Sequence, residues 1–371
     1  MQNFILKEIV TQNIEAELEK IGFDSAYRFK AADKYRYKTI KIFNLTPAQA
    51  NILKQTALIC GADCAVHREV ITGKVELSDA ILGGSISELK KIAEKLKKQP
   101  FSLSNLGNTI ELQFSKSQRK TKLAGILNIT PNSFSDGGKY FDAKLACEHL
   151  YKLVEDGADI IDIGAESTKP FAEPVAADIQ IERLRPVLME IKNISTPISI
   201  DTRSSDVARF ALEHGAKIIN DVSGMEYDPL IADVVSEYNA EIIIQHSCGN
   251  TENKPIYKDV VEEVYLSLLK KVELAKSKGI NNIILDVGIG FGKKREDNFE
   301  ILNRIEEFYS LDLPLMVGIS RKSLLGLENS NDNNLKDALS LAISYPLIQK
   351  RVDYLRVHNV KLHKQLISSV Y

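Results

Sequence analysis

Residues 125–138, with the sequence GILNITPNSFSDGG, begin as an apolar strand and continue as a run of small hydrogen-bonding side chains. Asn128 ends the apolar part, and polar residues such as Thr130, Asn132 and Asp136 follow it. Loops that follow buried strands often carry binding and catalytic residues. This loop is therefore the first candidate for part of a functional site.

Seven further apolar runs also end in polar residues. The strand-end residues are Asn128, Asp162 and Glu166, Asp201, Asn220 and Asp221, His246, Asp286, Ser320 to Lys322, and Arg356 and His358. If these runs are strands of one parallel barrel, their carboxyl ends meet at one mouth, where barrel enzymes carry their active sites. We therefore expect a shared catalytic mouth. Capping of a turn or helix is the alternative for any single residue, and we prefer it for Ser204, Ser205 and Asp228.

The spacing of apolar residues from 124 onward predicts eight strands that alternate with helices. The strand-like runs are AGILNI, ADIIDIG, PISID, AKIIND, AEIIIQH, NIILD, PLMVGI and VDYLRVH. Amphipathic segments follow them, most clearly at 142–156, 176–192, 259–278 and 332–350. Runs that are apolar on both faces are typical of a parallel sheet covered by helices. Eight such units predict an α/β fold with a (β/α)8 TIM barrel over residues 121–371, rather than an open doubly wound sheet.

Residues 1–120 have a different pattern and predict a small α+β accessory domain. YKTIKIFN and VELSDAILGG are strand-like, whereas TPAQANILKQTALIC and SISELKKIAEKLKKQP have a helical period with a Thr or Ser cap. The segment FSLSNLGNTI, at 101–110, reads as the passage into the barrel, and the basic run at 115–122 as a solvated connector. We expect no catalytic side chain in this domain.

The composition is that of an ordinary globular protein. The chain has 371 residues, 44% of them hydrophobic and 26% charged, with a formal net charge of −2, so it lacks the basic excess typical of nucleic-acid binding. The sequence shows no signal peptide and no apolar stretch long enough to cross a membrane, which predicts a cytoplasmic protein. The scattered cysteines Cys60, Cys64, Cys147 and Cys248 predict reduced thiols rather than disulfides or a zinc site.

Six sequence blocks together resemble the signatures of the dihydropteroate synthases, within the wider pterin-binding family. The blocks are GILNITPNSFSDGG with DIIDIGAESTKP, SIDTRSSDVARFALEHGAKIINDVSG, DVGIGFGK, GISRKSLLG and LRVHNV. The resemblance covers 124–371 and implies a transferase of folate biosynthesis, the class that sulfonamides target. The implied reaction joins 6-hydroxymethyl-7,8-dihydropterin pyrophosphate to 4-aminobenzoate and releases 7,8-dihydropteroate and pyrophosphate. It also implies Mg²⁺ as the cofactor and a homodimer.

The resemblance also implies roles for individual residues. Asp286 would accept hydrogen bonds from the aminopyrimidine edge of the pterin, with Asn220 and Lys322 as further ring contacts. Asp201 would stabilise the positive charge that grows as the bond to pyrophosphate breaks. Arg356 and His358 would bind phosphate oxygens. Catalysis would thus depend on Asp201, Lys322, Arg356 and His358.

The implied metal ligand is Asn128, which would contact a Mg²⁺ held mainly by the pyrophosphate. Side chains on other loops would form walls for 4-aminobenzoate and pyrophosphate; these are Ser167, Thr168, Lys169, Phe134, Phe291 and Ser320. Phe134 could instead pack only against its own loop. His246 is as compatible with a core position as with a wall of the pterin pocket.

Four positions depart from the commoner pattern of the family. Lys169 and Asn359 stand where Arg and Asp are usual, Val287 replaces Pro, and Ser247 stands where Met often follows the histidine. None of these replaces a matched catalytic group.

Two other functions are compatible with a pterin-binding barrel. A methyltetrahydrofolate-dependent methyltransferase shares the barrel but needs no pyrophosphate site, so Arg356 and His358 disfavour it. A catalytically silent pterin-binding homologue is the other alternative, and the intact first and second loops argue against it.

Overall fold

The computed structural model describes residues 6–9, 13–114, 120–129, 139–166, 174–248, 255–327 and 330–371. The chain divides into two compact units, Met1–Ser117 and Gln118–Tyr371. Within the described residues, no helix is both long and apolar enough to cross a membrane.

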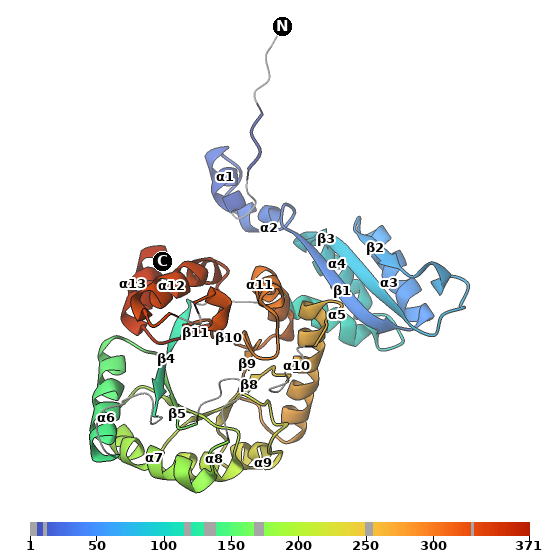
Figure 1. Cartoon of the computed structure of the whole chain (residues 1–371). Helices are drawn as coiled ribbons and strands as arrows, with labels where there is room; N and C mark the ends of the chain where they lie inside the picture. Colours follow the sequence, from blue (N-terminus) through green and yellow to red (C-terminus); the bar gives the residue numbers. More distant parts are fainter. Residues whose placement is uncertain are drawn as a thin grey trace. The chain divides into compact units, whose positions relative to one another are not determined.

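The second unit is a closed barrel of eight parallel strands (Figure 1). The strands are β4 (Lys122–Asn128), β5 (Ile160–Gly164), β6 (Ile198–Asp201), β7 (Ile218–Asp221), β8 (Glu241–Gln245), β9 (Ile283–Asp286), β10 (Leu315–Val317) and β11 (Tyr354–Val357). They follow one another around the barrel in chain order, and β11 closes it by pairing with β4. The predicted (β/α)8 barrel is confirmed.

Helices cover the outside of this barrel, as Figure 1 shows for α6 to α10. The helices are α6 (Lys139–Glu155), α7 (Ala177–Glu190), α8 (Ser205–Glu213), α9 (Leu230–Glu237), α10 (Val260–Ser277), α11 (Arg295–Asn303), α12 (Asn333–Gln349) and α13 (Val360–Val370). Asp228 accepts the N–H groups of Ser205 and Leu230, at the starts of α8 and α9, at 2.8 and 3.1 Å. The capping role expected for Asp228 is confirmed, whereas Ser204 makes no side-chain cap bond.

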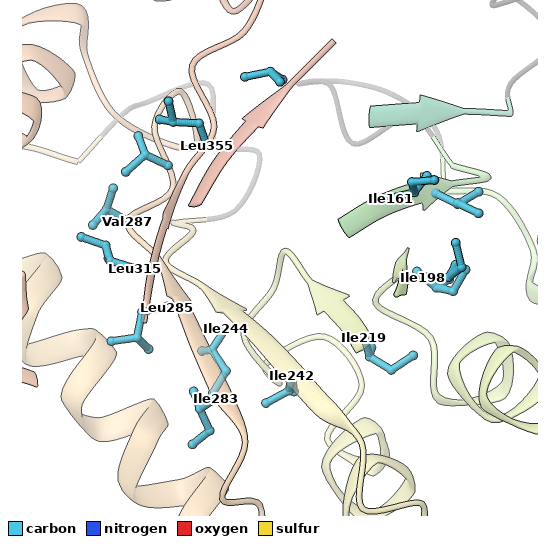
Figure 2. Close-up of a cluster of buried hydrophobic side chains, with 14 of the residues drawn as sticks. Ile161, Ile198, Ile219, Ile242, Ile244, Ile283, Leu285, Val287, Leu315 and Leu355 are labelled. Carbon is cyan, nitrogen blue, oxygen red and sulfur yellow. The ribbon is translucent and has the colours of Figure 1, made fainter. Parts of the chain in front are cut away.

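The barrel has two apolar layers because alternate residues of a strand point to opposite faces. Outward-facing residues pack under the helices; Figure 2 shows Ile161, Ile219 and Ile244 among them. The inner layer is a separate cluster of Ala124, Ile160, Ile218, Ile243, Ile284 and Met316. This inner layer fills the barrel axis below the carboxyl ends of the strands.

A polar residue stands two positions after most members of this inner layer, on the same face of its strand. Ile160 precedes Asp162, Ile218 precedes Asn220, and Ile284 precedes Asp286 in this way. The same spacing relates Tyr354, which packs against the layer, to Arg356. The period of two therefore places these polar side chains in the mouth, directly above an apolar floor.

The first unit contains a three-stranded antiparallel sheet in the order β1-β3-β2. Its elements are α1 (Ile14–Lys20), α2 (Arg28–Ala32), β1 (Tyr37–Leu45), α3 (Pro47–Ile59), β2 (Asp63–Val66), β3 (Ser78–Ser85), α4 (Ile86–Leu96) and α5 (Leu103–Leu112). Capping boxes at Thr46 and Ser85 begin α3 and α4, where the sequence predicts caps. A separate core, which includes Leu53, Leu82 and Leu89, stabilises this unit.

The prediction that 101–110 is a simple passage into the barrel is wrong, because Leu103–Leu112 form helix α5. Its polar and Gly-containing sequence resembles a loop, but Leu103 and Ile110 are buried in the core of the unit. Gly107 allows the close approach to α4, since a Cβ there would lie 2.7 Å from the carbonyl oxygen of Ala93. Strand β2 was also not predicted. Residues 115–119 of the predicted connector lie outside the described residues.

We expect a chain shortened to residues 118–371 to fold by itself, because its apolar cores share no residue with the core of the first unit. Calorimetry should show one unfolding transition, with a midpoint within about 4 °C of the barrel transition in the full chain. A change of about 1 kcal/mol in the unfolding free energy shifts the midpoint by this much in a domain of this size. A shortened chain without a cooperative transition would contradict this expectation.

Candidate active site

An ion-pair network lies at the centre of the barrel mouth. Arg356, on β11, donates from Nε to Asp162 Oδ2 at 2.6 Å and from Nη2 to Asp201 Oδ2 at 2.8 Å. Asp162 is fully buried and Asp201 nearly so, which makes the loss of either ion pair costly. The guanidinium therefore joins strands β5, β6 and β11 across the mouth.

Asp162 makes a second link to β6 and adds β7 to this network. Its Oδ1 accepts a hydrogen bond from Ser199 Oγ at 2.6 Å, and its Oδ2 accepts one from Asn220 Nδ2 at 2.9 Å. Because the amide nitrogen of Asn220 is occupied in this way, its Oδ1 is left as an acceptor for another group. Sequence reasoning placed Asp162 at a strand end but gave it no role. Its position two residues after Ile160 was the available signal.

Asp201 has an acceptor with no partner. Among the residues that the structure describes, its Oδ1 is the buried side-chain nitrogen or oxygen atom that makes no hydrogen bond. Burial raises the pKa of Asp201 to about 7, against the lowering effect of Arg356 and with a further rise from Asp162 and Glu166. An unpaired buried oxygen of this kind is suited to interact with a ligand that enters the mouth.

Asp286 lies at the end of β9, where its Oδ1 accepts the N–H of Gly288 at 2.7 Å. Burial raises the pKa of Asp286, and the ammonium of Lys322 opposes this rise. Only glycine fits at 288, because its φ is +66° and a Cβ there would lie 1.8 Å from the carbonyl oxygen of His246. The neighbouring Val287, which replaces the family's Pro, is fully buried in the core beneath the helices.

Lys322 reaches across from the loop after β10. Its Nζ donates to the carbonyl oxygen of Ile289 at 2.7 Å and lies 4.7 Å from the centre of the Phe291 ring. Burial lowers the pKa of Lys322 to about 8, although Asp286 and Asp201 raise it. Lys322 and Phe291 thus form one wall beside Asp286.

His358 and Ser320 form a second wall. Ser320 Oγ lies 3.2 Å from the backbone nitrogen of His358, whose N–H it accepts, and 3.0 Å from His358 Nδ1. Because Oγ already accepts the backbone N–H, its own proton is available to Nδ1, which leaves the proton of the imidazole on Nε2. Burial lowers the pKa of His358 to about 3, with Arg321 and Arg356 adding to the effect. The ring is therefore a neutral donor at pH 7.

The departure at Asn359 has a structural explanation. Its Oδ1 accepts the N–H of Leu362 at the start of α13, and its Nδ2 donates to Asp337 at 3.0 Å. Asp337 in turn binds Arg321 at 2.7 and 2.9 Å, which stabilises the positive φ of Arg321, 57°, between Ser320 and Lys322. An amide at 359 can donate to Asp337, whereas a carboxylate could not.

Other strand-end residues serve the loops. Glu166 binds Arg203 at 2.9 Å and accepts the N–H of Val175, and Asp221 accepts the backbone N–H groups of Ser223 and Met225. These are the capping roles that we considered as the alternative for any single strand-end residue.

Some predicted site residues lie outside the described part of the chain; these are Phe134, Ser167, Thr168 and Lys169. Asn128 is exposed at the end of β4 and close to Gly164, because a Cβ added at Gly164 would lie 3.5 Å from Asn128 Oδ1. Across the described ranges, no group of three or more His, Cys, Asp or Glu side chains could hold a metal ion. A single amide oxygen fits a Mg²⁺ whose other ligands are phosphate oxygens and water.

The structure is thus a (β/α)8 barrel in which carboxylates, an amide, an ammonium and a guanidinium meet at the carboxyl ends of the strands. The family described as "Pterin binding enzyme" matches residues 124–358. The chain belongs to this family.

Relatives of the chain carry names that include dihydropteroate synthase. It is 40% identical to "Dihydropteroate synthase" of Staphylococcus haemolyticus over 68% of this chain and 94% of that protein. It is 30% identical to "Bifunctional dihydropteroate synthase/dihydropteroate reductase" of Helicobacter pylori over 98% and 97% of the two chains. It is 34% identical to "Probable bifunctional folylpolyglutamate synthase/dihydropteroate synthase" of Haloferax volcanii over 91% of this chain, but spans only 43% of that protein.

Solved structures of dihydropteroate synthases are similar to the barrel. One is the enzyme of Xanthomonas albilineans with 4-aminobenzoic acid, at a TM-score of 0.64 and 33% identity over 68% of this chain and 92% of that one. Another is the enzyme of Anaplasma phagocytophilum with bound 6-hydroxymethylpterin-monophosphate, at a TM-score of 0.62 and 38% identity over 67% and 98%. These matches each cover about the length of the barrel.

Removal of the negative charge at Asp201 should change how stability depends on pH. A carboxyl whose folded-state pKa is about 7, raised from its usual 3.8, stabilises the fold below pH 4 and loses this contribution as the pH rises towards 7. The contribution is about 1.4 kcal/mol for each pH unit between the two pKa values. Denaturant unfolding of wild-type protein and Asp201→Asn between pH 4 and 8 measures it. The difference in unfolding free energy should move in favour of the variant as the pH rises, and a constant difference would contradict the raised pKa.

Proposed function

We propose that the chain is a dihydropteroate synthase, which joins 6-hydroxymethyl-7,8-dihydropterin pyrophosphate to 4-aminobenzoate. The observation that carries this proposal is the mouth itself, where acceptors for a ring edge lie beside donors for an anion. The similarity to dihydropteroate synthases with bound 4-aminobenzoic acid or a pterin monophosphate supports the same substrates.

The pterin ring would bind through acceptors from three strands. Its ring N–H and exocyclic amino group match the carboxylate of Asp286, much as an arginine fork matches a carboxylate. The Oδ1 of Asn220 and the unpartnered Oδ1 of Asp201 are further acceptors, since Asn220 Nδ2 is already bound to Asp162. Lys322 would donate to ring heteroatoms from the side of Phe291.

The pyrophosphate would bind to donors at β11. Arg356 retains N–H groups beyond those that bind Asp162 and Asp201, and the Nε2–H of neutral His358 is a further donor. In the reaction, the carbon–oxygen bond between the pterin methylene and pyrophosphate breaks, and its electron pair leaves with pyrophosphate. The amine nitrogen of 4-aminobenzoate forms the new bond to the methylene carbon and loses a proton. Asp201 would stabilise positive charge on the pterin as the carbon–oxygen bond breaks.

The proposed metal is Mg²⁺, with Asn128 as its protein ligand. When bound, the ion would neutralise charge on the pyrophosphate and so make it a better leaving group. The resemblance to the family implies that Phe134, Thr168 and Lys169 would contribute to the walls for 4-aminobenzoate and pyrophosphate. The homodimer, the cytoplasmic location and inhibition by sulfonamides remain predictions.

The direct test is turnover. Purified protein, the pterin pyrophosphate, Mg²⁺ and labelled 4-aminobenzoate should give labelled dihydropteroate and one pyrophosphate for each product molecule. Pterin binding without product would support the silent homologue instead. Methyl transfer from methyltetrahydrofolate, with no dihydropteroate formed, would support the methyltransferase.

Reduction of dihydropteroate is a second candidate activity. It is favoured by the match to the bifunctional Helicobacter pylori protein, which extends over 98% of this chain and so includes the first unit. Incubation of dihydropteroate with the full chain and a reduced nicotinamide or flavin nucleotide should then give tetrahydropteroate. Absence of this product with either reductant would exclude the second activity and leave the synthase proposal untouched.

Asp286→Asn should weaken pterin binding by roughly 2–4 kcal/mol, about 30- to 1000-fold, because an amide faces the ring donors with an NH₂ group and leaves buried donors unpaired. The variant can keep its oxygen towards Gly288, so the turn is preserved. Calorimetric titration with a pterin, alongside a melting curve, measures both effects.

A matched control is Asp221→Asn, which changes another buried strand-end carboxylate. Asp221 accepts the N–H groups of Ser223 and Met225 and the hydroxyl of Ser223, all within its own loop. This variant should lower the melting temperature and retain pterin affinity. Unchanged pterin affinity in a folded Asp286→Asn protein would show that Asp286 only caps its turn.

A further inference from the structure

Lys293, in the loop after β9, is a buried charged side chain that the proposed reaction does not use. It is 1% exposed and is one of the largest fully buried side chains of the described residues. A lysine ammonium is hardly ever buried to this extent unless acceptors surround it. Its contacts therefore indicate what the charge is for.

The Nζ of Lys293 is surrounded by acceptors from two loops. It donates to the carbonyl oxygens of Gly288 and Phe291, at 2.8 and 3.2 Å, within its own loop. On the neighbouring strand end it lies 2.9 Å from Nδ1 of His246 and donates to the carbonyl oxygen of His246 at 3.4 Å. The ammonium thus ties the loop after β9 to the end of β8.

The residues that Lys293 holds are those that position the pterin acceptor. The carbonyl of Gly288 binds Lys293, while the N–H of the same residue donates to Asp286 Oδ1. Phe291, whose carbonyl also binds Lys293, carries the ring that lies against Lys322. Displacement of this loop would therefore move both the hydrogen bond that orients Asp286 and the wall beside it.

We propose that Lys293 is a positioning residue for pterin recognition, which fixes the Asp286 carboxylate by tying the Gly288 and Phe291 carbonyls to His246. This inference deepens the proposed function and rests on it, because it assigns a role towards the same pterin site. His246 acquires a role at the same time. Its Nδ1 accepts from the ammonium, so its proton is on Nε2, and it forms the far anchor of the loop rather than a ligand contact.

The test is a double-mutant cycle on pterin affinity, measured by calorimetric titration of the full chain. Lys293→Met keeps the length of the side chain and removes all its donors. We expect it to weaken pterin binding at least about 10-fold, because the carboxylate loses its support. In an Asp286→Asn background the same change should cost about 3-fold or less, since the group that it positions is already impaired. Pyrophosphate affinity should change by no more than about 2-fold, because the anion site is on β11.

Lys271→Met is the matched control. Lys271 is also a buried lysine, which donates to the carbonyl oxygens of Ser223 and Gln245 and pairs with Glu226 at 3.1 Å. Its partners in the described part of the chain thus lie on the loop after β7 and the end of β8, not on the loop of Gly288 and Phe291. We expect this variant to destabilise the fold without coupling to Asp286→Asn. Equal losses from Lys293→Met in both backgrounds, or a lowered melting temperature with normal pterin affinity, would reduce Lys293 to a structural role and overturn the proposal.

A measurement on the wild-type protein does not depend on whether Lys293→Met folds. Burial lowers the pKa of His246 to about 3 and that of Lys293 to about 7, so at pH 6 a charged lysine faces a neutral ring. Nitrogen-15 NMR of His246 at this pH should therefore show an unprotonated Nδ1. A proton on Nδ1 would overturn the proposal. Wild-type protein that binds no pterin would overturn the proposed function, whereas normal wild-type binding with uncoupled variants would overturn only the role of Lys293.

Discussion

The arrangement of the mouth depends on one guanidinium bound between two buried carboxylates. Arg356 lies on β11, which β4 separates from β5 and β6, and it donates to Asp162 and Asp201. Asp162 also accepts hydrogen bonds from Ser199 and Asn220. Buried carboxylates without such a partner would be too costly to keep in the fold. The same contacts give each ligand group its orientation: Asn220 presents its oxygen, Asp201 keeps one oxygen unpaired, and Arg356 retains donors for an anion. Under the proposed function, the same atoms therefore supply both stability and ligand recognition.

The barrel makes this network possible because its strands alternate between floor and mouth. Ile160, Ile218 and Ile284 fill the axis, and the residue two positions later on each strand is polar and points into the mouth. An apolar floor excludes water from below, which strengthens the ion pairs above it. Loops then complete the site at different points: the tight turn at Gly288 orients Asp286, and the Asp337–Arg321 pair supports Ser320 and Lys322.

The fold could be predicted from the sequence because eight apolar runs with polar ends have few other solutions. The identities of Asp286, Asn220 and Lys322 as mouth residues followed from their places at strand ends and from a family resemblance. Contacts between distant strands could not be predicted. Asp162 has the same strand-end pattern as Glu166, yet it links its own strand β5 to β6, β7 and β11 through Ser199, Asn220 and Arg356. Glu166 instead holds a loop. Helix α5 was missed because Gly107, which reads as a loop residue, serves close packing against α4.

The central claim is that the buried carboxylate of Asp162 controls both the pterin site and the pyrophosphate site. Titrations of Asp162→Asn with a pterin and with pyrophosphate test this claim most directly. The amide cannot accept from Arg356, Asn220 and Ser199 together, so both affinities should fall at least about 10-fold while the protein remains folded. The control is Asp159→Asn. Asp159 directly precedes β5, the strand of Asp162, and its carboxylate accepts the N–H of Leu123. This variant should leave both affinities unchanged. Unchanged affinities in a folded Asp162→Asn protein would contradict the account.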